Sequence, residues 1–131
     1  MTNFSSASAP PLTDIWYFAA PSTEIKAGKM ERRFYLGRPV VLGRTDQGQV
    51  FALHDVCAHR AAPLSAGRQL QEGGRSCVEC PYHGWRFAVE DGQCMKIPAL
   101  SEKDNFPTEK IRTPAYPVHE EKGLIWIYIP E

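Results

Sequence analysis

The chain has 131 residues, of which 43% are hydrophobic, and its 15 basic and 15 acidic residues give a formal net charge of zero. This length predicts one domain rather than two. The charges are spread without long runs of one sign, so composition gives no indication of nucleic acid or an anionic membrane surface as a partner.

The first thirteen residues, 1–13, are rich in Ser, Ala and Pro. They have neither the basic and apolar regions of a secretory signal nor a twin-arginine signal, so we expect a disordered tail there. No run of eighteen apolar residues occurs in the chain, which argues against a transmembrane helix. The expected compartment is the cytoplasm, where the four cysteines are not expected to form a disulfide framework.

Residues 14–131 are predicted to form short antiparallel strands. Strands are expected at Arg33–Leu36, Pro39–Arg44, Gln49–Leu53, Arg75–Glu79, Arg86–Val89, Gln93–Ile97, Tyr116–Glu121 and Leu124–Ile129. Hairpin turns are expected at residues 45–48, 90–92 and 121–123. Eleven prolines and ten glycines leave room only for short helical turns, near residues 22–27 or 101–105. The predicted fold class is all-β, a small barrel or sandwich.

Three further segments have simple structural interpretations. Residues 69–75 (QLQEGGR) are predicted to form a surface hairpin with Gly73 and Gly74 at its tip. Residues 101–115 carry several charges and no convincing strand pattern, and they are expected to form a surface loop. The aromatic stretches at residues 16–18 and 126–128 are predicted to pack in the core and at sheet edges rather than to conduct electrons.

Two short motifs combine cysteine with histidine, C-A-H at residues 57–59 and C-P-Y-H at residues 80–83. Within each motif the spacing does not comfortably place both side chains on one iron. It does let the cysteine reach one iron of a 2Fe-2S cluster and the histidine the other. A structural zinc site is the alternative, because two Cys and two His also form a tetrahedral zinc set, although zinc motifs usually pair like ligands. The spacing favours iron–sulfur and leaves zinc open.

The segments CAHRAAPLSAG and CPYHGW resemble the two cluster-binding loops of the Rieske family, and the similarity extends over residues 14–130. The flanking stretches resemble the N-terminal domain of Rieske non-haem iron oxygenase terminal components, which hydroxylate rings or demethylate. The resemblance implies a Rieske fold with antiparallel β-sheets, in which a base barrel or sandwich carries a smaller cluster-binding lobe at about residues 55–97. It also implies a Rieske-type 2Fe-2S cluster, with an inner iron held by Cys57 and Cys80 and an outer iron held by His59 and His83.

The chain departs from the respiratory Rieske proteins, which carry an additional disulfide-forming cysteine in each loop. Ala62 and Tyr82 stand at those positions here, and Trp85 stands where the respiratory type has serine. Fewer hydrogen bonds to the sulfurs should place the potential below zero, in the lower part of the range of roughly −150 to +300 mV.

Cys77, His54 and His119 are predicted not to bind the metal, and Cys94 is assigned no role. Cys77 forms a C-x-x-C with Cys80, but its surroundings indicate a strand rather than the helix start of a thioredoxin-like motif. His54 and His119 are expected to be either hydrogen-bonded in the interior or on the surface.

The resemblance implies one-electron transfer. Two of the four histidines are assigned to the cluster, and by the resemblance the chain ends before the family's catalytic domain, with its two histidines and carboxylate on a mononuclear iron, would begin. We therefore expect no complete oxygenase active site in it. The favoured hypothesis is an isolated electron-accepting domain of an oxygenase system, because the Trp-Tyr opening and the closing GLIWIYIP resemble oxygenase components. The alternative is a free-standing Rieske ferredoxin that carries electrons from a reductase to an oxygenase, and a redox sensor is a third hypothesis. The partners implied are a reductase or ferredoxin as donor and an oxygenase catalytic domain as acceptor, with the isolated chain monomeric.

Overall fold

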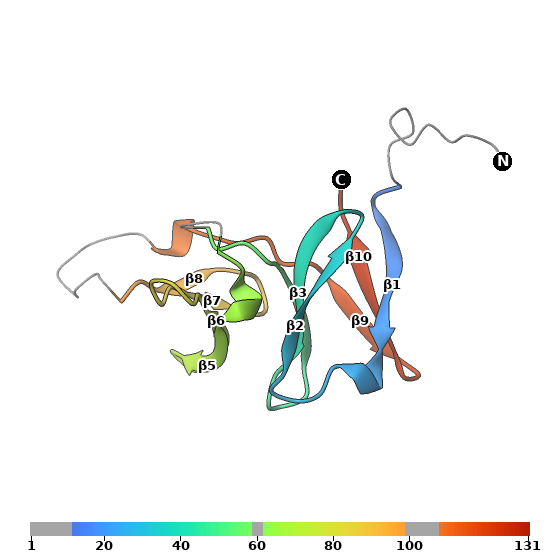
Figure 1. The fold of residues 1–131 in the computed structure, drawn as a ribbon, viewed down its shortest axis with the longest axis horizontal. Helices are drawn as coiled ribbons and strands as arrows, with labels where there is room; N and C mark the ends of the chain where they lie inside the picture. Colours follow the sequence, from blue (N-terminus) through green and yellow to red (C-terminus); the bar gives the residue numbers. More distant parts are fainter. Residues whose placement is uncertain (1–11, 59–61, 99–107) are drawn as a thin grey trace.

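The computed structural model describes residues 12–58, 62–98 and 108–131, which form three antiparallel sheets (Figure 1). The first sheet has the order β1 (Ile15–Pro21), β10 (Leu124–Ile129), β9 (Val118–Glu121). The second has the order β2 (Met30–Tyr35), β3 (Arg38–Arg44), β4 (Val50–His54). The third has the order β5 (Arg68–Glu72), β6 (Arg75–Glu79), β7 (Arg86–Ala88), β8 (Cys94–Lys96). Three 3-10 turns are η1 (Ser22–Glu24), η2 (Leu64–Ala66) and η3 (Thr108–Lys110).

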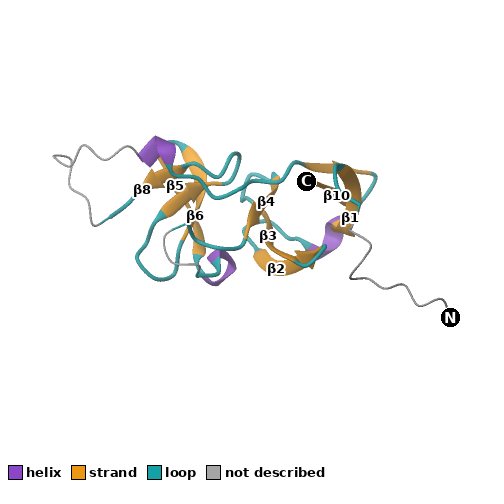
Figure 2. Cartoon of the chain, turned by 90° about the horizontal axis from the view of Figure 1, so that it is seen from above, coloured by secondary structure: helices purple, strands orange, loops and turns teal. Residues whose placement is uncertain are grey.

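The second sheet is the middle layer of the molecule, and its strands β3 and β4 are buried on both faces. Successive side chains of a strand point to opposite faces. Val40 and Leu42 of β3 therefore pack with Ile127 in one apolar cluster, whereas Val41 between them packs with Phe87 in another. This double burial explains the unbroken apolar run of β3. In Figure 2 the first and third sheets lie on either side of the second.

The predicted all-β class and hairpins are confirmed. β5 pairs with β6 so that Glu72 faces Arg75, which leaves Gly73 and Gly74 as a two-residue turn. β3 pairs with β4, β7 with β8, and β9 with β10, all antiparallel. The expected helical turn near residue 22 is η1, while residues 101–105 fall outside the described part of the chain.

Two parts of the first half differ from the sequence prediction. β1 was not expected, and it runs along the edge of the first sheet with Trp16 and Phe18 47% and 48% exposed. These aromatic rings therefore pack at a sheet edge and not in the core, against Tyr128 and Trp126 respectively. β2 begins at Met30, three residues before its predicted start, because an edge strand tolerates charged side chains toward solvent.

The segment before β9 ties the sheets together. In its described part it contains η3 and isolated bridges that pair Arg112 with Gln93 and Ala115 with Leu53. It therefore contacts both the third sheet and the second. Among the described residues, no helix is long and apolar enough to span a membrane.

Candidate metal centre

The two cysteine motifs lie in loops that meet at one end of the third sheet. The first loop follows β4 and returns through η2 to β5, and the second connects β6 to β7. Because Arg68 at the start of β5 faces Glu79 at the end of β6, the exit of the first loop adjoins the entrance of the second. A Cβ atom on Gly67 would lie 1.7 Å from the carbonyl oxygen of Glu79. Glycine is therefore required where the two loops touch.

Each loop closes on itself with the same hydrogen bond. The Cys57 N–H donates to the carbonyl of Ala62 at 2.7 Å, and the Cys80 N–H donates to the carbonyl of Trp85, also at 2.7 Å. In the second loop Gly84 adopts a φ of +72°, a left-handed conformation that glycine reaches without strain. The two cysteines thus occupy equivalent positions at the start of two similar closed turns.

Burial divides the expected ligands into two kinds. Cys57 and Cys80 are each 2% exposed and belong to one apolar cluster with Leu64 and Phe87. His83 is exposed beside Tyr82, which is 70% exposed. Two soft thiol donors inside and an imidazole donor at the surface fit the mixed ligand set of a Rieske cluster.

One of the four predicted ligands, His59, falls outside the described residues, as does Arg60. Among residues 12–58, 62–98 and 108–131, no three His, Cys, Asp or Glu side chains are gathered into a group that could hold a single metal ion. Trp85 packs partly buried against the apolar cluster that contains both cysteines.

An acidic residue lies shortly before each of the two cysteines, and neither was predicted from the sequence to have a role. Glu79, directly before Cys80, accepts from Arg68 Nε at 2.8 Å and is paired with Arg86 at 3.1 Å. These hydrogen bonds hold the pKa of Glu79 below its usual value, and the hydrogen bond from Arg68 makes the largest contribution. Asp55, two residues before Cys57, is fully buried. The sequence signal for a role of Asp55 was its position at the end of an apolar strand, which suggests burial, and a buried acid requires partners.

The other cysteines lie within strands. Cys77 is fully buried in the middle of β6, between Leu70 of β5 and Ala88 of β7. Cys94 is fully buried in β8 and belongs to the same apolar cluster as Cys57. Burial raises the pKa of each thiol to about 11, so both remain protonated at neutral pH.

The remaining described histidines lie outside both loops. His54 is half-buried at the end of β4, and its carbonyl oxygen accepts a hydrogen bond from Thr113. His119 is exposed on β9, with Nε2 2.9 Å from the Glu121 carboxylate. In neither case do these contacts bring the imidazole into a cysteine loop.

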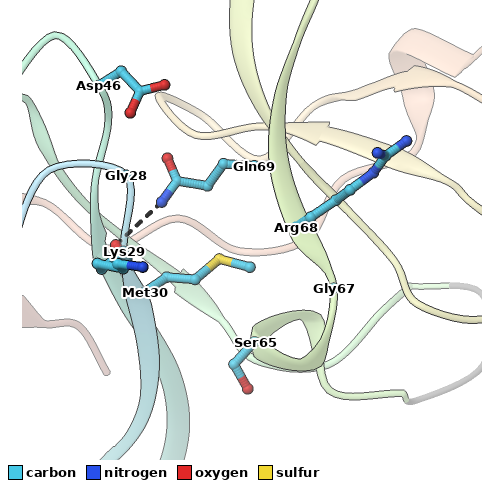
Figure 3. A pocket seen from close by; sticks show the side chains of 8 residues that line it. All are labelled: Gly28, Lys29, Met30, Asp46, Ser65, Gly67, Arg68 and Gln69. Atoms are coloured by element: carbon cyan, nitrogen blue, oxygen red, sulfur yellow. Dashed lines mark hydrogen bonds between the residues drawn. The ribbon is translucent and has the colours of Figure 1, made fainter.

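A polar cleft of about 360 Å³ lies between the start of β2 and the start of β5, at the border of the second and third sheets (Figure 3). Gln69 reaches across it and donates to the carbonyl oxygens of Lys29 and Arg44, at 3.1 and 3.3 Å. None of the described predicted ligands lines this cleft, whose lining residues are Gly28, Lys29, Met30, Asp46, Ser65, Gly67, Arg68 and Gln69. The cleft therefore lies between two sheets, and Cys57, Cys80 and His83 are not part of it.

The chain is similar to known proteins in both sequence and fold. The family model described as "Rieske [2Fe-2S] domain" matches residues 15–117. The iron–sulfur subunit TsaM1 of the toluene-4-sulfonate monooxygenase system of Comamonas testosteroni is 42% identical over 118 residues, covering 90% of this chain and 31% of that protein. The crystal structure of apo dicamba monooxygenase superposes with a TM-score of 0.78 at 36% identity, covering 94% of this chain and 35% of that one.

A further solved relative was determined together with a ferredoxin. It is a carbazole-bound oxygenase in complex with the ferredoxin of carbazole 1,9a-dioxygenase, with a TM-score of 0.76 and 28% identity, covering 91% of this chain and 29% of that one. The chain thus spans about a third of the length of these relatives.

Proposed function

Because this chain belongs to the Rieske [2Fe-2S] domain family, we propose that its two loops hold one cluster through four side chains and relay single electrons. Cys57 and Cys80 supply thiolates to one iron. His59 and His83 supply imidazoles to the other. When bound, the cluster supplies one-electron chemistry at a potential above that of clusters with four cysteines.

The contrast between buried thiols and an exposed imidazole is the observation that carries this proposal. Leu64 and Phe87 pack around Cys57 and Cys80, so they exclude water from the sulfur side. His83 stands at the surface, where a redox partner can approach it. The protein therefore offers one insulated side and one side suited to electron entry and exit.

We further propose that the domain, residues 14–131, works within an oxygenase system. The relatives named above are oxygenase components, and one of them was solved with a ferredoxin. On this proposal a ferredoxin or reductase donates the electron, and an oxygenase catalytic domain accepts it. The absence of extra loop cysteines, with Ala62 and Tyr82 in their places, supports a potential below zero.

Metal analysis of the purified chain tests the ligand assignment. The unmodified protein should contain two irons and two sulfides and should have a visible absorption spectrum. The substitutions Cys57→Ser and Cys80→Ser should each abolish the iron and sulfide content and the spectrum. His83→Cys should lower the reduction potential of any cluster that it retains, because cysteine ligation gives lower potentials than histidine ligation. Cys77→Ser is the matched control and should keep the cluster. A colourless protein that contains only zinc would refute the proposal.

Reconstitution tests the place of the domain in electron transfer. The chain is mixed with a reductase and a separate terminal oxygenase, and reduction and product formation are followed. An oxygenase domain should become reduced and support no turnover of a separate oxygenase. Repeated turnover that depends on the added chain would instead identify a ferredoxin.

A further inference from the structure

Asp55 is a fully buried carboxylate whose two oxygens both have partners. Its Oδ1 accepts a hydrogen bond from the backbone N–H of Ser65 at 2.7 Å, and its Oδ2 accepts one from the Ser65 hydroxyl at 2.6 Å. Arg32 Nε of β2 lies 3.1 Å from the same Oδ2. Burial of an ionised carboxylate is costly unless it is paired and hydrogen-bonded, and these contacts meet that requirement.

These contacts close the first cysteine loop at its base. Asp55 lies at the entrance of the loop and Ser65, in η2, lies at its exit, so the two hydrogen bonds join both ends around Cys57. In addition, the Thr113 hydroxyl lies 3.2 Å from the carbonyl oxygens of both His54 and Val56. The backbone that leads into Cys57 is therefore held by contacts from both Ser65 and Thr113.

From this geometry we infer that Asp55, Ser65 and Arg32 form a loop clamp that positions the first cluster loop and adjusts the reduction potential. The inference rests on the proposed function, since it takes Cys57 as a cluster ligand. Asp55 is a positioning residue: it acts through the loop, and its charge acts on the cluster from two residues away. Ser65 fixes the geometry, and Arg32 partly offsets the charge.

The two charges of the clamp have opposite effects on the added electron. A carboxylate in a low-dielectric interior disfavours an electron placed nearby, so Asp55 holds the potential down. The guanidinium of Arg32, more exposed and better screened, favours the electron and raises the potential to a smaller extent. Removing either residue breaks the same ion pair, but the two removals should move the potential in opposite directions.

Redox titration of the cluster-loaded chain separates charge from structure. Asp55→Asn should raise the reduction potential, whereas Arg32→Gln should lower it and Arg32→Lys should leave it near the unmodified value. Glu121→Gln removes a carboxylate from the exposed strand β9 and serves as the matched charge control, with no expected shift. Cluster loss to an iron chelator is measured in parallel. Ser65→Ala should lose iron severalfold faster, and Ser65→Thr, which keeps the hydroxyl, should restore the slow rate.

The outcomes distinguish this inference from the proposed function. An unmodified chain without a Rieske-type absorption spectrum would refute the proposed function. If the cluster is normal but its potential shifts in the same direction in Asp55→Asn and Arg32→Gln, or shifts in neither variant, the inference of a loop clamp is refuted and the proposed function stands. If Asp55→Asn does not accumulate as folded protein, the comparison of Arg32→Gln with Arg32→Lys decides. A role of the Arg32 charge predicts a lower reduction potential for the glutamine variant than for the lysine variant, whereas a purely steric role predicts no such difference.

Discussion

Replacement of Gly67 by alanine tests whether the two cysteine loops depend on a close backbone contact. The added Cβ atom would lie 1.7 Å from the carbonyl oxygen of Glu79 and 3.2 Å from that of Leu64. Both neighbours are backbone atoms, so no side-chain rotation can relieve the contact. The Gly67 N–H also donates to the Leu64 carbonyl at 2.9 Å, which ties the position to η2.

The cost of this substitution can be estimated from the geometry. The Glu79 carbonyl has to recede by roughly 1 Å or more before the contact becomes tolerable. This movement strains the pairing of Arg68 with Glu79 at the start of the β5–β6 ladder. Overpacking of this kind costs typically about 1–3 kcal/mol, and a clash with backbone belongs at the upper end. A loss of about 3 kcal/mol corresponds to a fall in melting temperature of about 10 °C for a domain of this size.

Thermal unfolding and iron content together provide the assay. Gly67→Ala should melt about 10 °C lower and retain less iron, because the carbonyl that moves belongs to the residue before Cys80. Gly48→Ala is the control: its φ is +94° and no atom lies within 4 Å of the added Cβ, so it should cost only about 1 kcal/mol and keep its iron. A Gly67→Ala protein with unchanged melting temperature and full iron would show that the loops do not depend on this contact.

Three further predictions concern the layers around the site. Leu53→Ala, in the fully buried centre of the middle sheet, should lower the free energy of unfolding in urea by about 3–4 kcal/mol; a loss below about 1 kcal/mol would contradict this packing. The Arg44 guanidinium, hydrogen-bonded to Glu120, holds the pKa of that carboxyl below its usual value. Its stabilisation is therefore present above the unfolded pKa and is lost as pH falls through the lower folded pKa. Glu120→Gln should weaken the acid dependence of the melting temperature, and an unchanged dependence would count against the pair. Cys94, with a pKa raised to about 11, should resist alkylation at neutral pH in the folded protein and react after unfolding; rapid labelling of the folded protein would contradict its burial.

The hairpins could be predicted from the sequence because their signals are local. Asp91-Gly92 marks the turn between β7 and β8, and Gly73-Gly74 marks the turn between β5 and β6. The cysteine–histidine motifs are equally local, since the spacing within each motif restricts the chemistry of its side chains. Such features require no knowledge of the rest of the chain.

Contacts between distant segments could not be predicted in the same way. β1 was not predicted because it lacks a clear alternation of apolar and polar residues. The side chains of Trp16 and Phe18 face solvent, and the strand becomes buried only toward its end. The pairing of Asp55 with Arg32 joins β2 to the end of β4 and has no sequence signal beyond an acid after an apolar run. The approach of Gly67 to Glu79 likewise emerges only once β5 pairs with β6.

The β5–β6 hairpin explains how two loops far apart in sequence come close together. The chain leaves the first loop at Gly67, runs outward along β5, turns at Gly73-Gly74 and returns along β6 to Glu79. In an antiparallel pair, residues added equally to both strands lengthen the ribbon at its tip and leave the facing pairs at its base unchanged. The approach of the loops is therefore set by the pairing of Arg68 with Glu79 and by the contact at Gly67. Spacing within each motif restricts the chemistry open to its side chains, whereas the number of residues between the motifs can vary without moving the bases of the two loops.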